Sequence, residues 1–434
     1  MEGDLIITGG RPLNGTVRIP AAKNSVLPLL AASLLCSSPV RLRAVPELAD
    51  VDTSLQLLQS AGCEAGWQGS DIVVQGVPGV CRLGADAAAR MRASILFCPP
   101  LLVRLGRAGT VLPGGCRIGA RPVDLHLSGL AQMGAVCRAE GERLILTAPS
   151  GLHGAEITLR FPSVGATETL LLAAAAAQGK TVLRGAAREP EIVDLAAFLN
   201  RCGACVQGAG SSTIRVEGRR SLSGCSFAPM ADRIVASTFA CACAAAGGRV
   251  ELTGCAPEIY RPLLEILEQM GCGVKYGPES VVVSRFGRLH GAGKVFTGVY
   301  PALATDAAPL LAAAMLTADS ESSIEDVVFE RRFACAEGFA AFGGRVCTEG
   351  RTLCILPCTG LKGANTAAPD LRGGAALVIA ALAAQGKSRV TNTALIDRGY
   401  AGFAPMLAEL GSEIRRETRP SDGTEKKRHA KNQF

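Results

Sequence analysis

Aromatic residues are scarce in this chain. They make up 4% of the 434 residues, with one Trp, so the core must be built from Ala, Leu, Val and Ile. Histidine occurs four times, and the CxxC formed by Cys202 and Cys205 has no second CxxC at a zinc-like distance, so we expect no metal site. The 17 cysteines are interpreted as reduced thiols that pack as small apolar side chains.

Long apolar runs are also missing. The most apolar segments, Leu170–Ala177 and Ala375–Ala384, are far shorter than the roughly 18–20 residues that a membrane span needs. The first residues, Met-Glu-Gly-Asp, are acidic and lack the basic and apolar regions of a secretory signal. We therefore expect a cytoplasmic protein that makes no contact with a membrane.

The positive charge is concentrated at the end of the chain. Of the net charge of +7, +4 falls on residues 415–434, which leaves +3 on the rest. A net charge of +3 on the rest of the chain is too small to indicate nucleic-acid binding, so we expect no nucleic-acid partner. The polar, aperiodic segment 415–434 is predicted to be a disordered basic tail, which leaves open that it touches RNA or a partner.

A repeat organises the remaining sequence. Six apolar segments each end in a Gly that is followed by a strand-like run, at intervals of 68 to 72 residues: Gly62, Gly134, Gly203, Gly271, Gly343 and Gly411. A Gly in this place is typical of a helix C-terminus, where the backbone turns left-handed. Six copies of an α/β unit, roughly βαβαββ, are predicted, three in each of two lobes. Segments 168–178 and 374–385 are apolar almost all round, so these helices are expected inside the lobes with sheets outside.

Basic residues precede several of the apolar helices. Lys23, Arg92, Arg372 and Arg398 each lie at a predicted helix start, where the helix dipole disfavours a cation. Each alone could be a solvated side chain. Their recurrence is most simply explained by a polyanionic ligand bound in a cleft between the lobes.

One loop carries a candidate reactive cysteine. In VLPGGCRIGARPVDLHLSGL (111–130), turn-forming residues surround Cys116, and Arg117 and Arg121 lie close by. Nearby cations lower the pKa of a thiol, and a Gly-rich loop could close over a cleft. The alternative is a hairpin turn with a passive Cys. His126 is either a satisfied core histidine or a catalytic base.

Three other segments have two interpretations each. In RFPSVGATETL (160–170), Ser163, Gly165 and Thr167 either cap a helix or bind a diphosphate. Asp306 directly precedes an apolar helix and is either a helix cap or a general base. The charged segment AAREPEIVDL (186–195) is interpreted as solvated or as a structural ion pair.

Taken together, these segments resemble the enolpyruvyl transferases. The matching motifs span about residues 5–414 in family order: AAKNSVLP (21–28), DVDTS (50–54), MRAS (91–94), LPGGCRIGARPVDLH (112–126), SVGAT (163–167), AAREPEIVD (186–194), DRI (232–234), YPALATD (300–306), VVFERRF (327–333), DLRGGAAL (370–377) and IDRGY (396–400). The Cys loop favours members that act on UDP-N-acetylglucosamine over those that act on shikimate phosphate. The resemblance implies a two-lobed inside-out α/β barrel with residues 22–230 in the first lobe, and residues 1–21 and 231–414 in the second.

The resemblance also implies roles for the matching residues. The enolpyruvyl group of phosphoenolpyruvate would move to the 3-hydroxyl of UDP-N-acetylglucosamine, with no metal or organic cofactor, in an early step of peptidoglycan precursor synthesis. Phosphoenolpyruvate would contact Lys23, Asn24, Arg121, Arg372 and Arg398. The sugar nucleotide would contact Asn24, Arg92, Arg121, Pro122, Val123, Asp124, Leu125, Ser163, Val164, Gly165, Asp306, Val328 and Phe329. The catalytic residues would be Lys23, Arg398, Asp306 as the base, and Cys116, which could also form a covalent phosphothioketal.

The sequence departs from the family pattern in places. Phe161-Pro162 stands where some members have a Lys, and Arg331 stands where Asn is usual. These differences leave two alternatives open: a paralogue with another hydroxyl acceptor, and a sugar-nucleotide-binding protein without turnover. The oligomeric state is left open.

Overall fold

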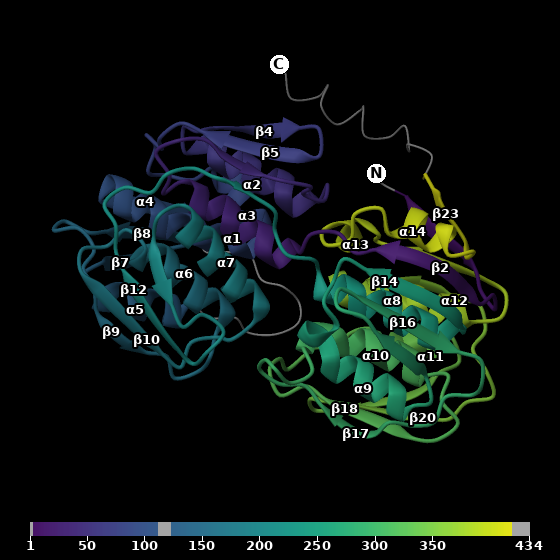
Figure 1. The fold of residues 1–434 in the computed structure, drawn as a ribbon. Coiled ribbons are helices and arrows are strands. Elements are labelled where there is room, and N and C mark those ends of the chain that lie inside the picture. Colours follow the sequence, from purple (N-terminus) through teal and green to yellow (C-terminus); the bar gives the residue numbers. More distant parts are fainter. Residues whose placement is uncertain (1–2, 112–122, 419–434) are drawn as a thin grey trace, which may run out of the picture.

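The computed structural model describes residues 3–111 and 123–418. Two lobes lie side by side, and the N-terminal strand β2 (Leu13–Arg18) belongs to the same lobe as the C-terminal half of the chain (Figure 1). The Cys116 loop, with Arg121 and Pro122, lies outside the described residues, as does the chain from 419 onward. In the described part of the chain, no helix has both the length and the apolar character needed to cross a membrane.

The first lobe contains three α/β units around one hydrophobic core. Its helices are α1 (Lys23–Ser33), α2 (Ala49–Ser60), α3 (Ala85–Arg90), the 3-10 helix η1 (Arg92–Phe97), α4 (Cys98–Leu105), α5 (Asp124–Gln132), α6 (Val164–Ala174) and α7 (Pro190–Arg201). Its strands form sheets in the orders β13-β3-β5-β4, β6-β8-β7 and β11-β12-β10-β9. They are β3 (Val40–Leu42), β4 (Glu64–Gln68), β5 (Asp71–Gln75), β6 (Arg107–Val111), β7 (Val136–Glu140), β8 (Arg143–Thr147), β9 (Glu156–Thr158), β10 (Lys180–Arg184), β11 (Cys205–Gln207), β12 (Thr213–Glu217) and β13 (Ser226–Phe227).

The second lobe repeats this plan around its own core. Its helices are α8 (Arg233–Ala246), η2 (Pro257–Tyr260), α9 (Arg261–Gln269), η3 (Thr305–Ala307), α10 (Ala308–Met315), α11 (Ala336–Ala341), α12 (Leu371–Ala383), α13 (Ala394–Asp397) and α14 (Phe403–Glu409). The sheets have the orders β15-β16-β14-β2, β17-β18-β20-β19 and β21-β22-β1-β23. The strands, besides β2, are β1 (Asp4–Thr8), β14 (Gly248–Thr253), β15 (Gly273–Tyr276), β16 (Ser280–Arg285), β17 (Gly293–Phe296), β18 (Ser322–Glu325), β19 (Arg345–Glu349), β20 (Thr352–Leu356), β21 (Asn365–Ala367), β22 (Lys387–Thr391) and β23 (Glu413–Glu417).

The predicted repeat is present in the structure. Each of the six repeat glycines follows the C-terminus of a helix with φ between +87° and +101°, the left-handed region that Gly enters without steric cost. The third unit runs β9-α6-β10-α7-β11-β12, which is the expected βαβαββ order. The sixth unit lacks a final strand of its own, and β1 takes that place by pairing antiparallel with both β22 and β23.

Apolar helices fill the centre of each lobe. Helices α8, α10 and α12 contact one another in the second lobe, and their side chains are almost all buried. Helix α6 is equally buried in the first lobe. Because these helices have no polar face, they must be covered on all sides, and the sheets cover them from outside. The inside-out α/β arrangement predicted from the sequence is thereby confirmed.

Two segments of the chain connect the lobes and lie against each other. Ala21 and Ala231 form an antiparallel bridge, in which the N–H of Ala22 donates to the carbonyl oxygen of Met230 (2.7 Å). Asp232 caps α8, and its other carboxylate oxygen accepts from the N–H of Lys23 (3.2 Å). The starts of α1 and α8 are therefore held together at the crossing.

One boundary differs from the expectation. The basic tail was expected to begin at 415, but Arg415–Glu417 belong to β23 and pair with β1. Strand pairing, which depends on the distant N-terminus, overrides the polar composition of this segment.

Candidate active site

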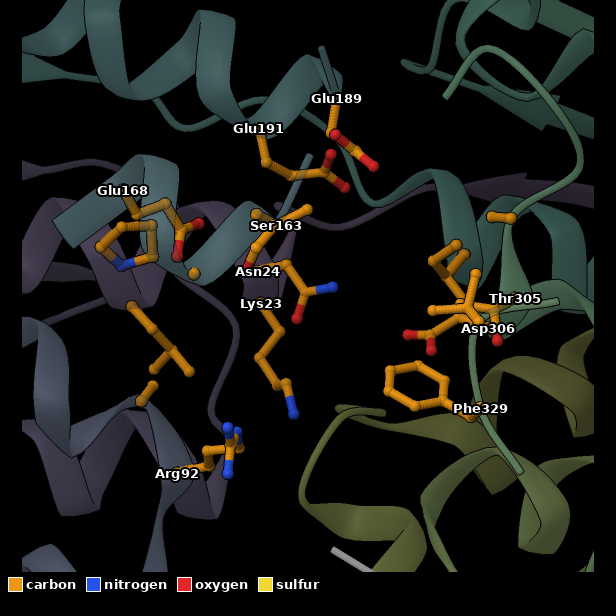
Figure 2. A pocket seen from close by; sticks show the side chains of 18 of the residues that line it. Lys23, Asn24, Arg92, Ser163, Glu168, Glu189, Glu191, Thr305, Asp306 and Phe329 are labelled. Atoms are coloured by element: carbon orange, nitrogen blue, oxygen red, sulfur yellow. The ribbon is translucent and has the colours of Figure 1, made fainter. Parts of the chain in front are cut away.

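A cavity of about 730 Å³ lies between the two lobes and is lined by both. Figure 2 shows Lys23, Asn24 and Arg92 on one side, facing Asp306 and Phe329 on the other. Many residues singled out in the sequence line this cavity: Lys23, Asn24, Arg92, Asp124, Leu125, Ser163, Val164, Gly165, Asp306, Val328, Phe329, Arg372 and Arg398. Val123 is the N-cap residue of α5 and is not among the lining residues.

Helix starts from both lobes face the cavity. Helix α1 begins at Lys23, η1 begins at Arg92 and α12 begins one residue before Arg372. Ser163 caps α6 by accepting from the N–H of Ala166 (3.3 Å), so its capping interpretation holds even though it also lines the cavity. The N-terminal ends of these helices carry partial positive charge, which makes the cavity favourable for anions.

Asp50 joins the cations of the two lobes. Its carboxylate accepts from Nζ of Lys23 (3.0 Å) in the first lobe and from Nε of Arg398 (3.0 Å) in the second. Burial alone would raise the pKa of Asp50, but the charges of Lys23 and Arg398 outweigh it and lower the pKa below its ordinary value. Asp50 therefore occupies, as an anion, the space between two cations that face the cavity.

Asp306 is held by two buried arginines. Arg332 donates to its Oδ1, and Nε of Arg372 donates to its Oδ2 (3.2 Å). Asp306 lies inside η3 rather than at its N-cap, so the interpretation as a helix cap is wrong. Asp370 does cap α12, by accepting from the N–H groups of Arg372 (3.0 Å) and Gly373 (2.9 Å). Asp306 is therefore fixed at the cavity wall, with an arginine donating to each of its carboxylate oxygens.

Three glutamates form an acidic wall near the top of Figure 2. Glu191 accepts from Nε of Arg233 (3.0 Å), so the ion-pair interpretation of this segment holds for Glu191. Burial raises the pKa of Glu189 and, more strongly, that of Glu168, where the neighbouring Glu191 and Glu189 add to the effect. The wall is therefore less negative than three carboxylates would suggest.

His126 is buried as expected of a core histidine, although it also borders the cavity. Its side chain is buried, and Nδ1 lies 2.7 Å from Oγ1 of Thr169. Burial, reinforced by the nearby Arg92, lowers its pKa to about 4. His126 is therefore neutral at pH 7 and packs against the start of α6.

Two lining residues, Asp50 and Arg332, were not predicted from the sequence. Asp50 lies in the matching segment DVDTS (50–54) and Arg332 in VVFERRF (327–333), but no role was predicted for either residue, and Arg331, which departs from the family pattern, is exposed. Asp50 precedes Arg398 by 348 residues, so no local pattern connects them. In the described residues, no three His, Cys, Asp or Glu side chains are grouped so that they could hold a metal ion.

Comparisons with known proteins agree with one another. Residues 7–407 match the family model described as EPSP synthase (3-phosphoshikimate 1-carboxyvinyltransferase). Curated proteins named UDP-N-acetylglucosamine 1-carboxyvinyltransferase are similar over nearly their whole length: 42% identity with that of Finegoldia magna (93% of this chain, 96% of the relative) and 43% with that of Acidiphilium cryptum (94% and 98%).

Solved structures show the same architecture. The enolpyruvyl transferase NikO from Streptomyces tendae superposes with a TM-score of 0.85 at 27% identity, covering 96% of this chain and all of that one. EPSP synthase from Acinetobacter baumannii, at 17% identity, gives a TM-score of 0.73 over 96% of this chain and all of that one, which supports the fold alone.

Proposed function

The chain belongs to the EPSP synthase family of enolpyruvyl transferases, and on that basis we propose that it transfers the enolpyruvyl group of phosphoenolpyruvate to the 3-hydroxyl of UDP-N-acetylglucosamine. The observation that carries the proposal is the convergence of Lys23, Arg372 and Arg398 from opposite lobes on one cavity. The product would be a precursor of peptidoglycan, and the reaction would take place in the cytoplasm.

Phosphoenolpyruvate would bind where the cations meet. Its phosphate would replace the carboxylate of Asp50 between Lys23 and Arg398, and Arg121 would join them. Its carboxylate would bind Arg372, whose buried Nη1 has no hydrogen-bond partner within the described ranges 3–111 and 123–418. A buried guanidinium nitrogen without a partner is costly, and a bound carboxylate would satisfy it.

UDP-N-acetylglucosamine would extend from this point along the first lobe. The start of α6, with Ser163, Val164 and Gly165, would take the diphosphate, because these residues line the cavity and the start of a helix favours anions. Arg92 would add positive charge. The segment from Arg121 to Leu125 would border the uridine, and Asn24, Asp306, Val328 and Phe329 would contact the sugar.

The reaction would be an addition followed by an elimination. Asp306 would take the proton of the 3-hydroxyl while that oxygen attacks C2 of phosphoenolpyruvate, and the thiol of Cys116 would protonate C3. Loss of the C3 proton and of phosphate from the tetrahedral adduct would restore the vinyl group. A covalent phosphothioketal on Cys116 is a side branch of the same chemistry.

Holding the two substrates in position would supply much of the rate enhancement. Bringing two anionic substrates together in one cavity can be worth roughly 7–11 kcal/mol. Fixed cations would stabilise the charge that develops on the phosphate and carboxylate, and a general base contributes about 10²–10⁴-fold. The proposed steps are proton transfers and charge stabilisation by side chains of this protein, so they would require no organic cofactor.

The test is phosphate release by the purified full-length protein with both substrates, with each alone, and with other hydroxyl acceptors. Release that requires both phosphoenolpyruvate and UDP-N-acetylglucosamine, with the enolpyruvyl ether identified by mass spectrometry, is the expected result. Release with a different acceptor only would identify a paralogue. Calorimetric binding of the UDP-sugar without release would identify a binding protein, and either outcome would contradict the proposal.

A further inference from the structure

We propose that Asp326, which lies outside the cavity, is a positioning residue that couples the seating of the UDP-sugar to the alignment of Asp306. This inference rests on the function proposed above. Asp326 directly follows β18 and its side chain is fully buried (0% exposed). A carboxylate so far from water must be satisfied by fixed partners, and here each of its oxygens serves a different part of the site.

The first oxygen organises the loop that faces the sugar. Oδ1 of Asp326 accepts from the N–H of Val328 and from the N–H of Phe329, both at 2.8 Å. Val328 and Phe329 both line the cavity. A ligand that shifts Val328 or Phe329 would therefore change the hydrogen bonds that their backbone N–H groups donate to Asp326.

The second oxygen is connected to Asp306. Oδ2 of Asp326 accepts from the hydroxyl of Thr305 and lies 3.8 Å from Nε of Arg332. That same Nε donates to the carbonyl oxygen of Thr305 (2.7 Å), and the end of the Arg332 side chain donates to Asp306. Arg332 is 2% exposed, so these contacts are not screened by water.

A ring contact connects the same two parts a second time. The guanidinium of Arg332 lies over the ring of Phe329, 5.4 Å from its centroid. The loop that would contact the sugar and the arginine that holds Asp306 are thus connected through Phe329 as well as through Asp326. A rotation of the Asp326 carboxylate cannot change one set of contacts without changing the other.

The variant Asp326→Asn separates the contacts of Oδ1 from those of Oδ2. The amide oxygen can still accept from Val328 and Phe329. The amide nitrogen would face Thr305 and Arg332, and the negative charge would be lost. We expect kcat to fall about 10-fold or more, KM for phosphoenolpyruvate to change less than about 3-fold, and the affinity for UDP-N-acetylglucosamine, measured by calorimetry, to weaken only several-fold. Glu325→Gln is the matched control, because Glu325 pairs with Lys294 (3.4 Å) on the sheet and does not line the cavity.

Thr305 provides a second test should Asp326→Asn fold poorly, because its hydroxyl donates to Asp326 and accepts from Nε of Arg332 (3.0 Å). Thr305→Val removes the hydroxyl at nearly constant shape and should reproduce the loss in kcat with UDP-sugar affinity retained, and Thr305→Ser should restore kcat. Thermal unfolding of each variant shows whether stability has changed.

Three results would overturn the inference while leaving the proposed function intact in an active wild type. They are Asp326→Asn matching Glu325→Gln in kcat, Thr305→Val matching Thr305→Ser, and a lower melting temperature with unchanged kinetics. Absence of turnover in the wild type would contradict the proposed function itself, and the inference with it.

Discussion

Asp50 and Arg398 form an ion pair across the two lobes, with Oδ1 of the carboxylate 3.0 Å from Nε of the guanidinium. Lys23 shares the same carboxylate at 3.0 Å. The two cations proposed to bind the phosphate of phosphoenolpyruvate are thus already arranged around an anion, which belongs to the protein itself. The anionic substrate would find this pair of cations preorganised rather than having to assemble it.

The ion pairs of Asp50 predict a pH dependence of stability. Because the pKa of Asp50 is lower in the folded state than its ordinary value near 3.9, its stabilising contribution is fully present above that value and is lost as the pH falls through the folded-state pKa. Asp50→Asn should remove this contribution. The melting temperature of the variant should therefore lie below that of the wild type at neutral pH, and the difference should shrink below pH 4.

Asp52→Asn is the control for this measurement. Asp52 lies on the same helix, is exposed and accepts from the indole of Trp67 (3.1 Å), a contact that Asn can also make. A constant difference between Asp50→Asn and the wild type down to the lowest pH would contradict the assignment.

His126 predicts a second dependence, at higher pH. Its pKa of about 4 in the folded state lies below the value near 6.5 in the unfolded chain, so the unfolded state binds more protons between these values. Stability should therefore fall as the pH is lowered from 6.5 to 4, by up to about 3 kcal/mol at about 1.4 kcal/mol per unit. In His126→Gln this part of the decline should disappear in denaturant titrations.

The exposed His153 supplies the comparison, since His153→Gln should leave the decline in place. Equal slopes in His126→Gln and the wild type would show that His126 is not buried in its neutral form.

The repeat glycines predict a backbone effect on stability. Gly203 has φ +97° and open space around the position of a Cβ, so Gly203→Ala would strain the backbone without a steric clash. We expect a loss of about 1–2 kcal/mol in the free energy of unfolding. Gly66, in β4, has equally open space but no positive φ, so Gly66→Ala should cost little in the same denaturant titration. Equal losses in the two variants would show that the left-handed backbone is not the cause.

Local patterns were sufficient for much of the fold. A left-handed helix end requires Gly, and a helix buried on all sides requires an apolar sequence, so both features are visible in a few consecutive residues. The last strand of the sixth unit was not visible, because it is supplied by β1 from the other end of the chain. Arg415–Glu417 therefore read as the start of a tail although they belong to a sheet.

The candidate site was predictable to a similar extent. Cations at helix starts are conspicuous because they oppose the helix dipole, and Lys23, Arg92 and Arg372 lie at helix starts and line the cavity. Arg398 also lines the cavity, but it is the C-cap residue of α13, so the prediction of a helix start at Arg398 is wrong. Their carboxylate partners gave no signal, because pairs such as Asp50 with Arg398 form only after folding. Arg331 and Arg332 lie in an irregular segment, where no periodicity tells which of the two faces inward.

The most direct test of the whole account is a double-mutant cycle across the lobes. Phosphate release is measured against phosphoenolpyruvate concentration, at saturating UDP-N-acetylglucosamine, for Lys23→Ala, Arg398→Ala and the double variant. Because both cations would contact one phosphate, each single change should lower kcat/KM about 10–100-fold, and the double variant should lose less than the product of the two. The exposed Arg415→Ala serves as the control. Wild-type kinetics in both single variants would contradict the account.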